Sequence, residues 1–335
     1  MSDLQTAALA ASGYPCLVAD IGGTNARFGL VAGPGCAVEH IAKLPASEHA
    51  GPTQAAQAYL AGVASGQGSA FQPPRRAAFA VATVVGGERI ELTNSHWDFA
   101  PREVETELGL DLLLMLNDFE ALALSLPRLQ AAQLRAHGDL PNQRGTMAVI
   151  GPGTGLGVAG VTQTAHGWVA LPGEGGHATL AAADAFEADL LAWVRRDYAH
   201  VSAERLLSGI GLPLLYRAVA AVTGVPDLGL PAEQVVERGV AGTDPTCVRA
   251  LKVFCALLGG FAGNVALTLG ARGGIYIGGG IVPRLGELFF ESQFRERFEA
   301  KGRFEPYLAN IPTALITDTL AALSGATLAI EQHGA

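Results

Sequence analysis

Short apolar runs, separated by glycine-rich turns and by longer helical segments, divide this chain into strands and helices. Residues 15–43 predict three strands in a meander, with Gly22-Gly23-Thr24-Asn25 at the first turn. Further strands are expected at 77–84, 89–93, 112–116, 146–150, 275–277 and 314–317, with Gly86-Gly87 as the hairpin turn between the first two. Helices are expected at 53–64 (capped by Thr53), 101–108, 119–126, 183–198, from Ser202, and at 212–222, 232–238, 245–269, 290–301 and 320–332. Residues 135–144 read as a polar loop.

The first turn combines an acid with two glycines. Asp20 ends an apolar strand, and the glycines after it let backbone N–H groups approach a bulky anion without an intervening Cβ. Thr24 adds a hydroxyl donor, and Asp20 could hold a hydrated Mg²⁺ beside phosphates. A plain hairpin turn is the alternative interpretation.

The same pattern of strand, glycine turn and strand recurs at residues 147–161. There an apolar strand is followed by Gly153, Thr154 and Gly155, and a second apolar strand follows them. This weak internal repeat suggests duplicated domains that face each other across a cleft, each binding one side of a polyphosphate. A third strand ends in Gly278, Gly279 and Gly280, whose bare backbone would let a flat ring lie against it.

Asp118 follows the apolar strand 112–116 and starts the helix 119–126. A carboxylate at the carboxyl end of a buried strand is where α/β proteins place active sites. Helix capping by Asp118 is the competing explanation.

Three more polar residues suit a hydroxyl-rich small molecule, and the role of a fourth, Glu204, is left open. Asn94 offers an amide to sugar hydroxyls, although a polar turn explains it as well. Glu174 and His177 lie in a glycine-bounded loop, which supplies only two potential metal ligands and favours hydrogen bonding instead. Glu204 is one residue short of capping-box spacing from Ser202, so a capping box does not explain it.

Composition narrows the class of protein. The 335 residues suggest two domains, and a net charge of -9 argues against nucleic acid as the main partner. The 4 cysteines, Cys16, Cys36, Cys247 and Cys255, form no cluster and are interpreted as reduced, with no zinc site. Residues 1–14 read as a loose N-terminal extension rather than a signal peptide. The uncharged run 253–271 is long enough for a membrane span, but its glycines favour a buried helix, so we expect a cytoplasmic protein with no membrane partner.

Six motifs in unbroken order resemble those of bacterial glucokinases, in the non-zinc group of the hexokinase/actin-like ATPase superfamily. They are Asp20–Arg27 (DIGGTNAR), Leu116–Phe119 (LNDF), Gly151–Gly157 (GPGTGLG), Leu171–His177 (LPGEGGH), Ser202–Gly209 (SAERLLSG) and Gly278–Pro283 (GGGIVP). The resemblance implies a two-domain α/β fold of the ribonuclease-H-like (hexokinase/actin) type with a cleft between domains, and usually a homodimer. It also implies ATP-dependent phosphorylation of glucose at its 6-hydroxyl, the first step of glycolysis. The expected domains are 15–128 with 318–335, and 129–317.

Carried over residue by residue, the resemblance makes Asp118 the catalytic base. The implied sugar ligands are Asn94, Asn117, Asp118, Glu174, His177 and Glu204. The implied nucleotide contacts are Ala19, Asp20, Ile21, Gly22, Gly23, Thr24, Gly153, Thr154, Gly155, Gly278, Gly279 and Gly280, with Mg²⁺ held through water near Asp20. Ala19 stands where many members have glycine. A kinase for mannose, fructose or N-acetylglucosamine is the alternative enzyme. A sugar-responsive regulator on the same fold would predict a basic helix-turn-helix segment, and none precedes residue 15.

Overall fold

The predicted meander forms three strands of a five-stranded sheet in the computed structural model, which describes residues 13–92 and 94–333. The sheet order is β3-β2-β1-β4-β7. The strands are β1 (Cys16–Ile21), β2 (Asn25–Val31), β3 (Val38–Pro45), β4 (Arg76–Val81) and β7 (Leu112–Asn117). The first three are antiparallel, whereas β1, β4 and β7 are parallel. Parallel strands end at the same edge of a sheet, so Ile21, Val81 and Asn117 lie level with one another.

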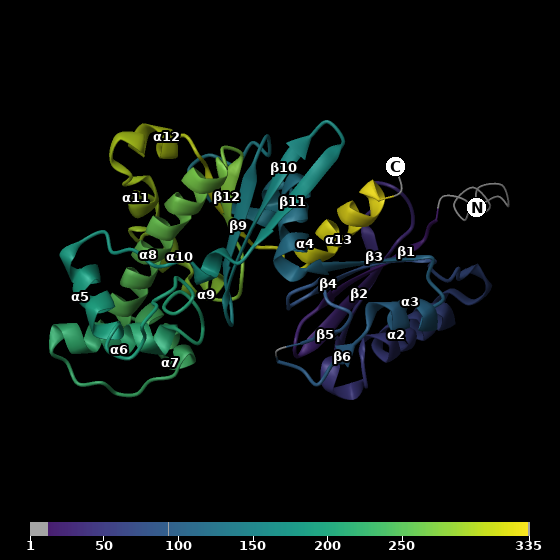
Figure 1. Cartoon of the computed structure of the whole chain (residues 1–335), viewed down its shortest axis with the longest axis horizontal. Helices are drawn as coiled ribbons and strands as arrows, with labels where there is room; N and C mark the ends of the chain where they lie inside the picture. Colours follow the sequence, from purple (N-terminus) through teal and green to yellow (C-terminus); the bar gives the residue numbers. More distant parts are fainter. Residues whose placement is uncertain (1–12, 93, 334–335) are drawn as a thin grey trace. The chain divides into compact units, whose positions relative to one another are not determined.

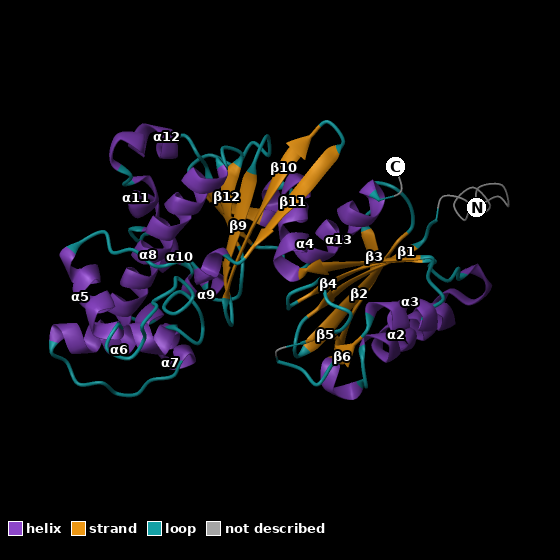
Figure 2. Ribbon diagram, viewed as in Figure 1, coloured by secondary structure: helices purple, strands orange, loops and turns teal. Residues whose placement is uncertain are grey.

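Helices cover both faces of this first sheet, with α2 and α3 on one face and α4 and α13 on the other (Figures 1 and 2). Their bounds are α2 (Pro52–Gln67), α3 (Pro101–Glu107), α4 (Asp118–Ser125) and α13 (Ala321–Gln332). Alternate residues of β1, Leu17, Ala19 and Ile21, join the apolar core beneath α2 and α3. On the other face, α13 approaches α4 so closely that a Cβ on Gly325 would lie 1.6 Å from the carbonyl oxygen of Ala121.

A second, six-stranded sheet has the order β11-β10-β9-β12-β13-β8. Its strands are β8 (Leu134–His137), β9 (Met147–Pro152), β10 (Leu156–Thr164), β11 (Gly167–Gly173), β12 (Gly274–Ile277) and β13 (Thr313–Ile316). It repeats the first sheet: β9 pairs antiparallel with β10 and parallel with β12, as β1 does with β2 and β4. The internal repeat predicted at 17–30 and 147–161 is therefore confirmed at the level of sheet topology.

The remaining helices pack with this second sheet around α8 (Pro245–Leu269). They are α5 (Ala185–Val194), α6 (Leu212–Thr223), α7 (Ala232–Val240), α9 (Val282–Leu285), α10 (Glu287–Phe290), α11 (Phe294–Glu299) and α12 (Glu305–Ala309). Helix α8 is long and apolar enough to cross a membrane, and it is the one such helix among the described residues. Its most apolar stretch is 72% buried within the protein, which is the usual state of a core helix.

The chain divides into two compact units. The first holds the chain up to Arg128, the segment Thr164–Ala170 and the chain from Thr319 onward. The second holds Leu129–Gln163 and Leu171–Asp318. The sequence-based division into 15–128 with 318–335 and 129–317 remains a prediction, and it differs from these units chiefly in the segment 164–170. Residues 1–12 of the predicted N-terminal extension lie outside the described residues.

Several predicted elements are wrong in detail. The strand predicted at 89–93 is only β5 (Ile90–Glu91), and it pairs with β6 (Asp98–Phe99) rather than across Gly86-Gly87. The loop predicted at 135–144 begins with the edge strand β8, and the helix predicted at 290–301 is interrupted between α10 and α11. Helix α2 begins one residue before Thr53, so its N-cap is Gly51.

Candidate active site

Asp118 is held by the junction between β7 and α4. The N-cap of α4 is Asn117, not Asp118: the Asn117 side chain accepts the Phe119 N–H at 2.9 Å, and the Glu120 carboxylate accepts the Asn117 N–H at 3.3 Å. The Asn117 amide also donates to the carbonyl of Thr83 at 3.0 Å. Asp118 accepts a share of the same Phe119 N–H, at 2.9 Å. A reciprocal capping box therefore fixes the backbone that carries the Asp118 carboxylate.

Burial raises the pKa of Asp118 from 3.8 to about 6. The negative charge of Asp20 raises it further, whereas the Phe119 N–H opposes the shift. Burial also raises the pKa of Asp20, and the guanidinium of Arg27 counteracts that rise through an ion pair of 2.9 Å. In the first unit the charge of Asp20 thus acts on Asp118, whose raised pKa of about 6 lies in the range suited to a general base.

The first glycine turn packs against the segment that carries Asn94. The Gly22 N–H donates to the Asn25 carbonyl at 2.9 Å, which closes the turn between β1 and β2. A Cβ on Gly23 would lie 2.6 Å from the Asn94 carbonyl oxygen, so a side chain at position 23 would displace Asn94. Asn94 itself lies in the turn between β5 and β6. Among the predicted residues of the first unit, the glycine turn and Asn94 therefore adjoin each other.

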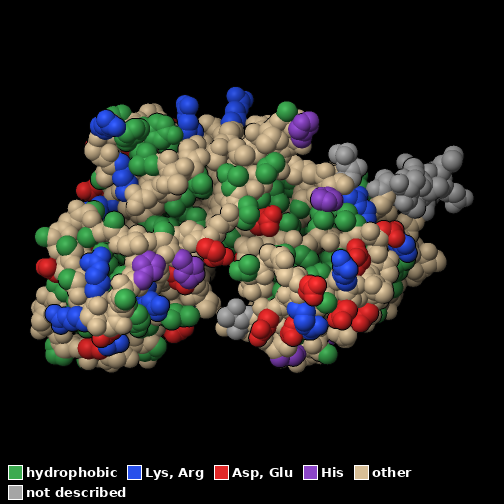
Figure 3. Space-filling model, in the orientation of Figure 1, with side chains coloured by type: hydrophobic (Ala, Val, Ile, Leu, Met, Phe, Trp, Pro, Cys, Tyr) green, Lys and Arg blue, Asp and Glu red, His purple; other side chains and the backbone are tan. Residues whose placement is uncertain are grey.

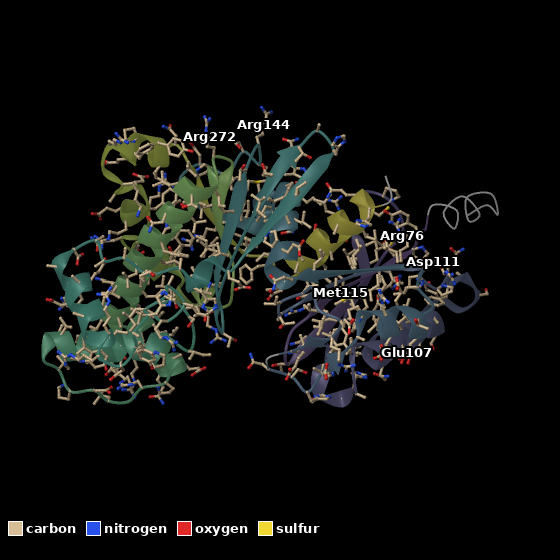
Figure 4. All side chains as sticks on the ribbon, viewed as in Figure 1. Arg76, Glu107, Asp111, Met115, Arg144 and Arg272 are labelled. Atoms are coloured by element: carbon tan, nitrogen blue, oxygen red, sulfur yellow. The ribbon has the colours of Figure 1, made fainter. Side chains whose placement is uncertain are left out.

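Several charged side chains lie at the opposite ends of the strands, away from Asn117 and the glycine turn. Arg76 begins β4 and Asp111 precedes β7, while Met115 lies within β7 on the way to Asn117 (Figure 4). In the second unit Arg144 precedes β9 and Arg272 precedes β12, and both side chains point away from the sheet (Figure 4). Asp and Glu side chains lie among Lys and Arg on the surface of the first unit (Figure 3). One such pair joins Arg89, which precedes β5, to Asp98 of β6. Exposed pairs of this kind contribute little to stability.

The second glycine turn connects β9 and β10. The Gly153 N–H donates to the Gly155 carbonyl at 2.9 Å, and the Gly209 N–H donates to the Gly153 carbonyl at 2.8 Å. The Glu204 carboxylate accepts the Leu156 N–H at 2.8 Å. The segment 202–209, predicted as the start of a helix, instead forms turns that contact this glycine turn.

The loop with Glu174 and His177 lies beside the same segment. A Cβ on Gly176 would lie 2.0 Å from the Leu156 carbonyl oxygen, so only glycine lets this loop approach β10 so closely. The Glu204 N–H donates to the Gly176 carbonyl at 2.8 Å. The imidazole Nε2 of His177 lies 3.8 Å from the Glu204 carboxylate, and the two side chains are 62% and 32% exposed. His177 and Glu204 thus lie side by side, with Glu174 three residues before His177 in the same loop.

A pocket of about 410 Å³ adjoins the second and third glycine turns. Gly153, Thr154 and Gly280 line it together with Glu233, Val236, Arg284 and other residues of α6, α7 and α9. Gly279 closes its turn with φ of +75° and leaves room for the Pro152 carbonyl oxygen, which would lie 2.3 Å from a Cβ there. Sequence reasoning missed the α7 contribution. The sequence feature that could have indicated this contribution is the spacing of Ala232 and Val236, which are four residues apart and therefore share one face of a helix.

A larger pocket of about 900 Å³ beside β8 holds none of the predicted site residues. Its arginines are already engaged: Arg135 donates to both carboxylate oxygens of Glu287. Arg295 donates to the carbonyls of Ile311 and Ala309 at 2.7 and 2.9 Å. Because its arginine side chains are already hydrogen-bonded, this pocket is a weaker candidate for a ligand site than the glycine turns, despite its larger volume.

Among residues 13–92 and 94–333, no three His, Cys, Asp or Glu side chains come together in a way that could hold a metal ion. The four cysteines carry free thiols, and three of them are buried.

The two units share a five-strand order, β3-β2-β1-β4-β7 in one and β11-β10-β9-β12-β13 in the other, and each has a glycine turn in a hairpin, β1–β2 or β9–β10. This is the actin-like ATPase fold, to which sugar kinases belong. The solved structures agree. A glucokinase from an Antarctic psychrotroph superposes with a TM-score of 0.87 at 36% identity, covering 95% of this chain and 98% of that one. A ROK family glucokinase from Streptomyces griseus, in complex with glucose and AMPPNP, has a TM-score of 0.61 at 21% identity, over 94% and 98% of the chains, and shows the fold alone.

This chain belongs to the glucokinase family, whose model matches residues 17–333. A curated relative, the glucokinase of Aromatoleum aromaticum, is 49% identical over 322 residues, which is 95% of each chain. The family and the fold that the six motifs indicated are therefore confirmed.

Proposed function

We propose that this chain transfers the terminal phosphoryl group of ATP to the 6-hydroxyl of glucose, giving glucose 6-phosphate and ADP. The observation that carries the proposal is Asp118, a partly buried carboxyl group directly after a strand, whose pKa is raised to about 6. Such a group is ionised at neutral pH and can still accept a proton. Membership of the glucokinase family supports the same reaction.

In the proposed step, a sugar hydroxyl oxygen forms a bond to the terminal phosphorus while the bond from that phosphorus to ADP breaks. The hydroxyl proton passes to the Asp118 carboxylate. Because phosphoryl transfer has a loose transition state, positioning and charge neutralisation supply most of the acceleration. Asp118 therefore also aligns the hydroxyl.

The proposed sugar ligands are Asn94, Asn117, Asp118, Glu174, His177 and Glu204. These amide, carboxylate and imidazole groups match a ligand whose polar groups are all hydroxyls. Leaving such groups unpaired is costly, which provides discrimination between hexose epimers. In the second unit, Glu174 and His177 lie beside Glu204, a grouping that supports a shared ligand.

The proposed nucleotide contacts lie in the glycine turns and at the end of the strand before the first of them. The residues are Ala19, Asp20, Ile21, Gly22, Gly23 and Thr24 in the first unit, and Gly153, Thr154, Gly155, Gly278, Gly279 and Gly280 in the second. The pocket of about 410 Å³ beside Gly153 and Gly280 has room for an adenine base, with apolar walls from α6 and α7.

Asp20 fits a Mg²⁺ ion that arrives with the nucleotide. Mg²⁺ is usually held by one or two carboxylates, substrate phosphates and waters, and Arg27 favours the ionised form of Asp20. When bound, the ion would neutralise charge on the phosphates.

A coupled assay of ADP release across glucose, mannose, fructose and N-acetylglucosamine tests this proposal. We expect the highest kcat/KM with glucose. The substitution Asp118→Ala should lower kcat roughly 10²- to 10⁴-fold, while the circular dichroism spectrum stays unchanged. Near-full turnover by this variant would reject Asp118 as the base, and a preference for another hexose would replace glucose as the substrate.

The homodimer, the cytoplasmic location and the absence of a nucleic-acid or membrane partner remain predictions. Light scattering of the purified chain measures the oligomeric state, and fractionation of the native host locates the protein.

A further inference from the structure

The Glu204 carboxylate lies against the second glycine turn rather than projecting freely from its own segment. Its Oε2 atom accepts the Leu156 N–H at 2.8 Å. A Cβ on Gly155 would lie only 2.5 Å from that oxygen and 3.3 Å from the carboxylate carbon. The space that Glu204 occupies is thus the space that a side chain at position 155 would fill.

Hydrogen bonds hold the backbone of Glu204 in this position. Its N–H donates to the Gly176 carbonyl at 2.8 Å, and its carbonyl accepts the Ser208 hydroxyl at 2.8 Å. Five residues further along, the Gly209 N–H is bonded to the Gly153 carbonyl. A group pushed against Oε2 would therefore displace the carboxylate and not the chain that bears it.

The other carboxylate oxygen, Oε1, faces His177 at 3.8 Å. One carboxylate thus has one oxygen on the turn proposed to hold phosphate and the other beside a residue proposed to hold the sugar. The turn and the sugar ligands share a single rigid group.

We infer that Gly155, a residue of the nucleotide turn, is a determinant of sugar affinity, because its missing side chain provides the space in which Glu204 is positioned for the sugar. The inference rests on the proposed function, in which Glu204 binds the hexose. Gly155 acts through Glu204, so it is a positioning residue with no sugar contact of its own. By thermodynamic reciprocity, a sugar that orders Glu204 also orders the turn and strengthens nucleotide binding.

The test compares two substitutions in the same turn, Gly155→Ala and Gly153→Ala. A Cβ on Gly153 meets no atom within 4 Å, and neither glycine has a left-handed φ, so both positions accept alanine conformationally. Isothermal titration of the full chain with glucose, without nucleotide, gives the sugar Kd directly. We expect Gly155→Ala to raise this Kd about 10- to 100-fold, the effect of losing one charged hydrogen bond, and Gly153→Ala to leave it within about twofold.

The outcomes separate the inference from the proposed function. If the parent chain does not bind glucose, the proposed function fails. If the parent binds and the two alanine variants have the same glucose Kd, the inference is overturned.

A second comparison decides the matter if Gly155→Ala does not fold. Glu204→Gln removes the charge that holds both the sugar and the Leu156 N–H, whereas His177→Asn alters a sugar ligand alone. We expect Glu204→Gln to raise KM for both glucose and ATP severalfold, and His177→Asn to raise KM for glucose with KM for ATP unchanged. An unchanged KM for ATP in Glu204→Gln would show that its carboxylate does not position the turn.

Discussion

The substitution Asp118→Asn should stabilise the protein while it abolishes most of its activity. Folding raises the pKa of this carboxyl from 3.8 to about 6, so the folded state binds the proton more tightly than the unfolded state by roughly two powers of ten. Each power of ten corresponds to about 1.36 kcal/mol, so the ionised carboxylate costs up to about 3 kcal/mol above pH 6. Asparagine has nearly the same shape, can still accept the Phe119 N–H, and carries no charge.

The sign of this effect sets its dependence on pH. Below 3.8 both states are protonated and there is no cost; the cost grows as the pH rises from 3.8 to about 6 and is then constant. We expect a gain in unfolding free energy of about 3 kcal/mol at pH 7.5 and about 1 kcal/mol at pH 4.5, measured by urea denaturation. In the parent enzyme, kcat/KM for glucose should rise with pH, with a midpoint at about 6, because the base must be ionised.

The matched control is Asp111→Asn, which changes the net charge equally at the other end of β7. Asp111 is exposed and paired with Arg75, which lowers its pKa. This variant should keep the parent's kcat and gain no stability at pH 7.5. If Asp118→Asn is no more stable than the parent at pH 7.5, or gains equally at both pH values, burial is not the cause of its shifted pKa.

Two further predictions follow from the first unit. Arg27→Leu should raise the Mg²⁺ concentration needed for half-maximal rate severalfold, because Asp20 loses the guanidinium that favours its ionised form; an unchanged Mg²⁺ titration would refute this role. Gly325→Ala should destabilise the protein by about 1–3 kcal/mol, because its Cβ would overlap the Ala121 carbonyl oxygen where α13 crosses α4. By contrast, Gly62→Ala on the open face of α2 should stabilise it by about 0.5–1 kcal/mol, and equal effects in thermal melts would refute the packing argument.

The features that the sequence predicted well are those that local patterns determine. The three glycine turns follow apolar strands, and each strand–turn pair is a contiguous stretch with its own signature. Helix α8 occupies the predicted range 245–269 because Asp244 caps its start through the Thr246 and Cys247 N–H groups, and Gly270 ends it in a left-handed conformation. For the same reason the family was recognisable, since its six motifs all lie in such local elements.

The misjudged elements depend on partners distant in sequence. Ser202 does accept the Arg205 N–H at 3.2 Å, as a helix cap would. The Leu206 and Leu207 N–H groups also bond locally, to the Ala203 carbonyl. However, the Glu204 N–H donates to the Gly176 carbonyl and the Gly209 N–H to the Gly153 carbonyl, so the turn does not continue as a helix. Likewise β8 exists because its residues pair with β13, which lies more than 170 positions later in the chain. Which carbonyl a given N–H finds across such a separation is not encoded in a local pattern.

Because the chain is synthesised from its N-terminus, the first unit cannot complete its packing until the last helix has been made. Helix α13, residues 321–332, packs on α4, the helix that Asp118 begins, yet the whole second unit is translated between them. While a ribosome is still producing residues 129–318, α4 covers its face of the early sheet without α13, and Asp118, the proposed base, lies on a helix that lacks its neighbour. The packing of the first unit is therefore complete only once α13 has been made, and loss of α13 would remove a structural element rather than a dispensable tail.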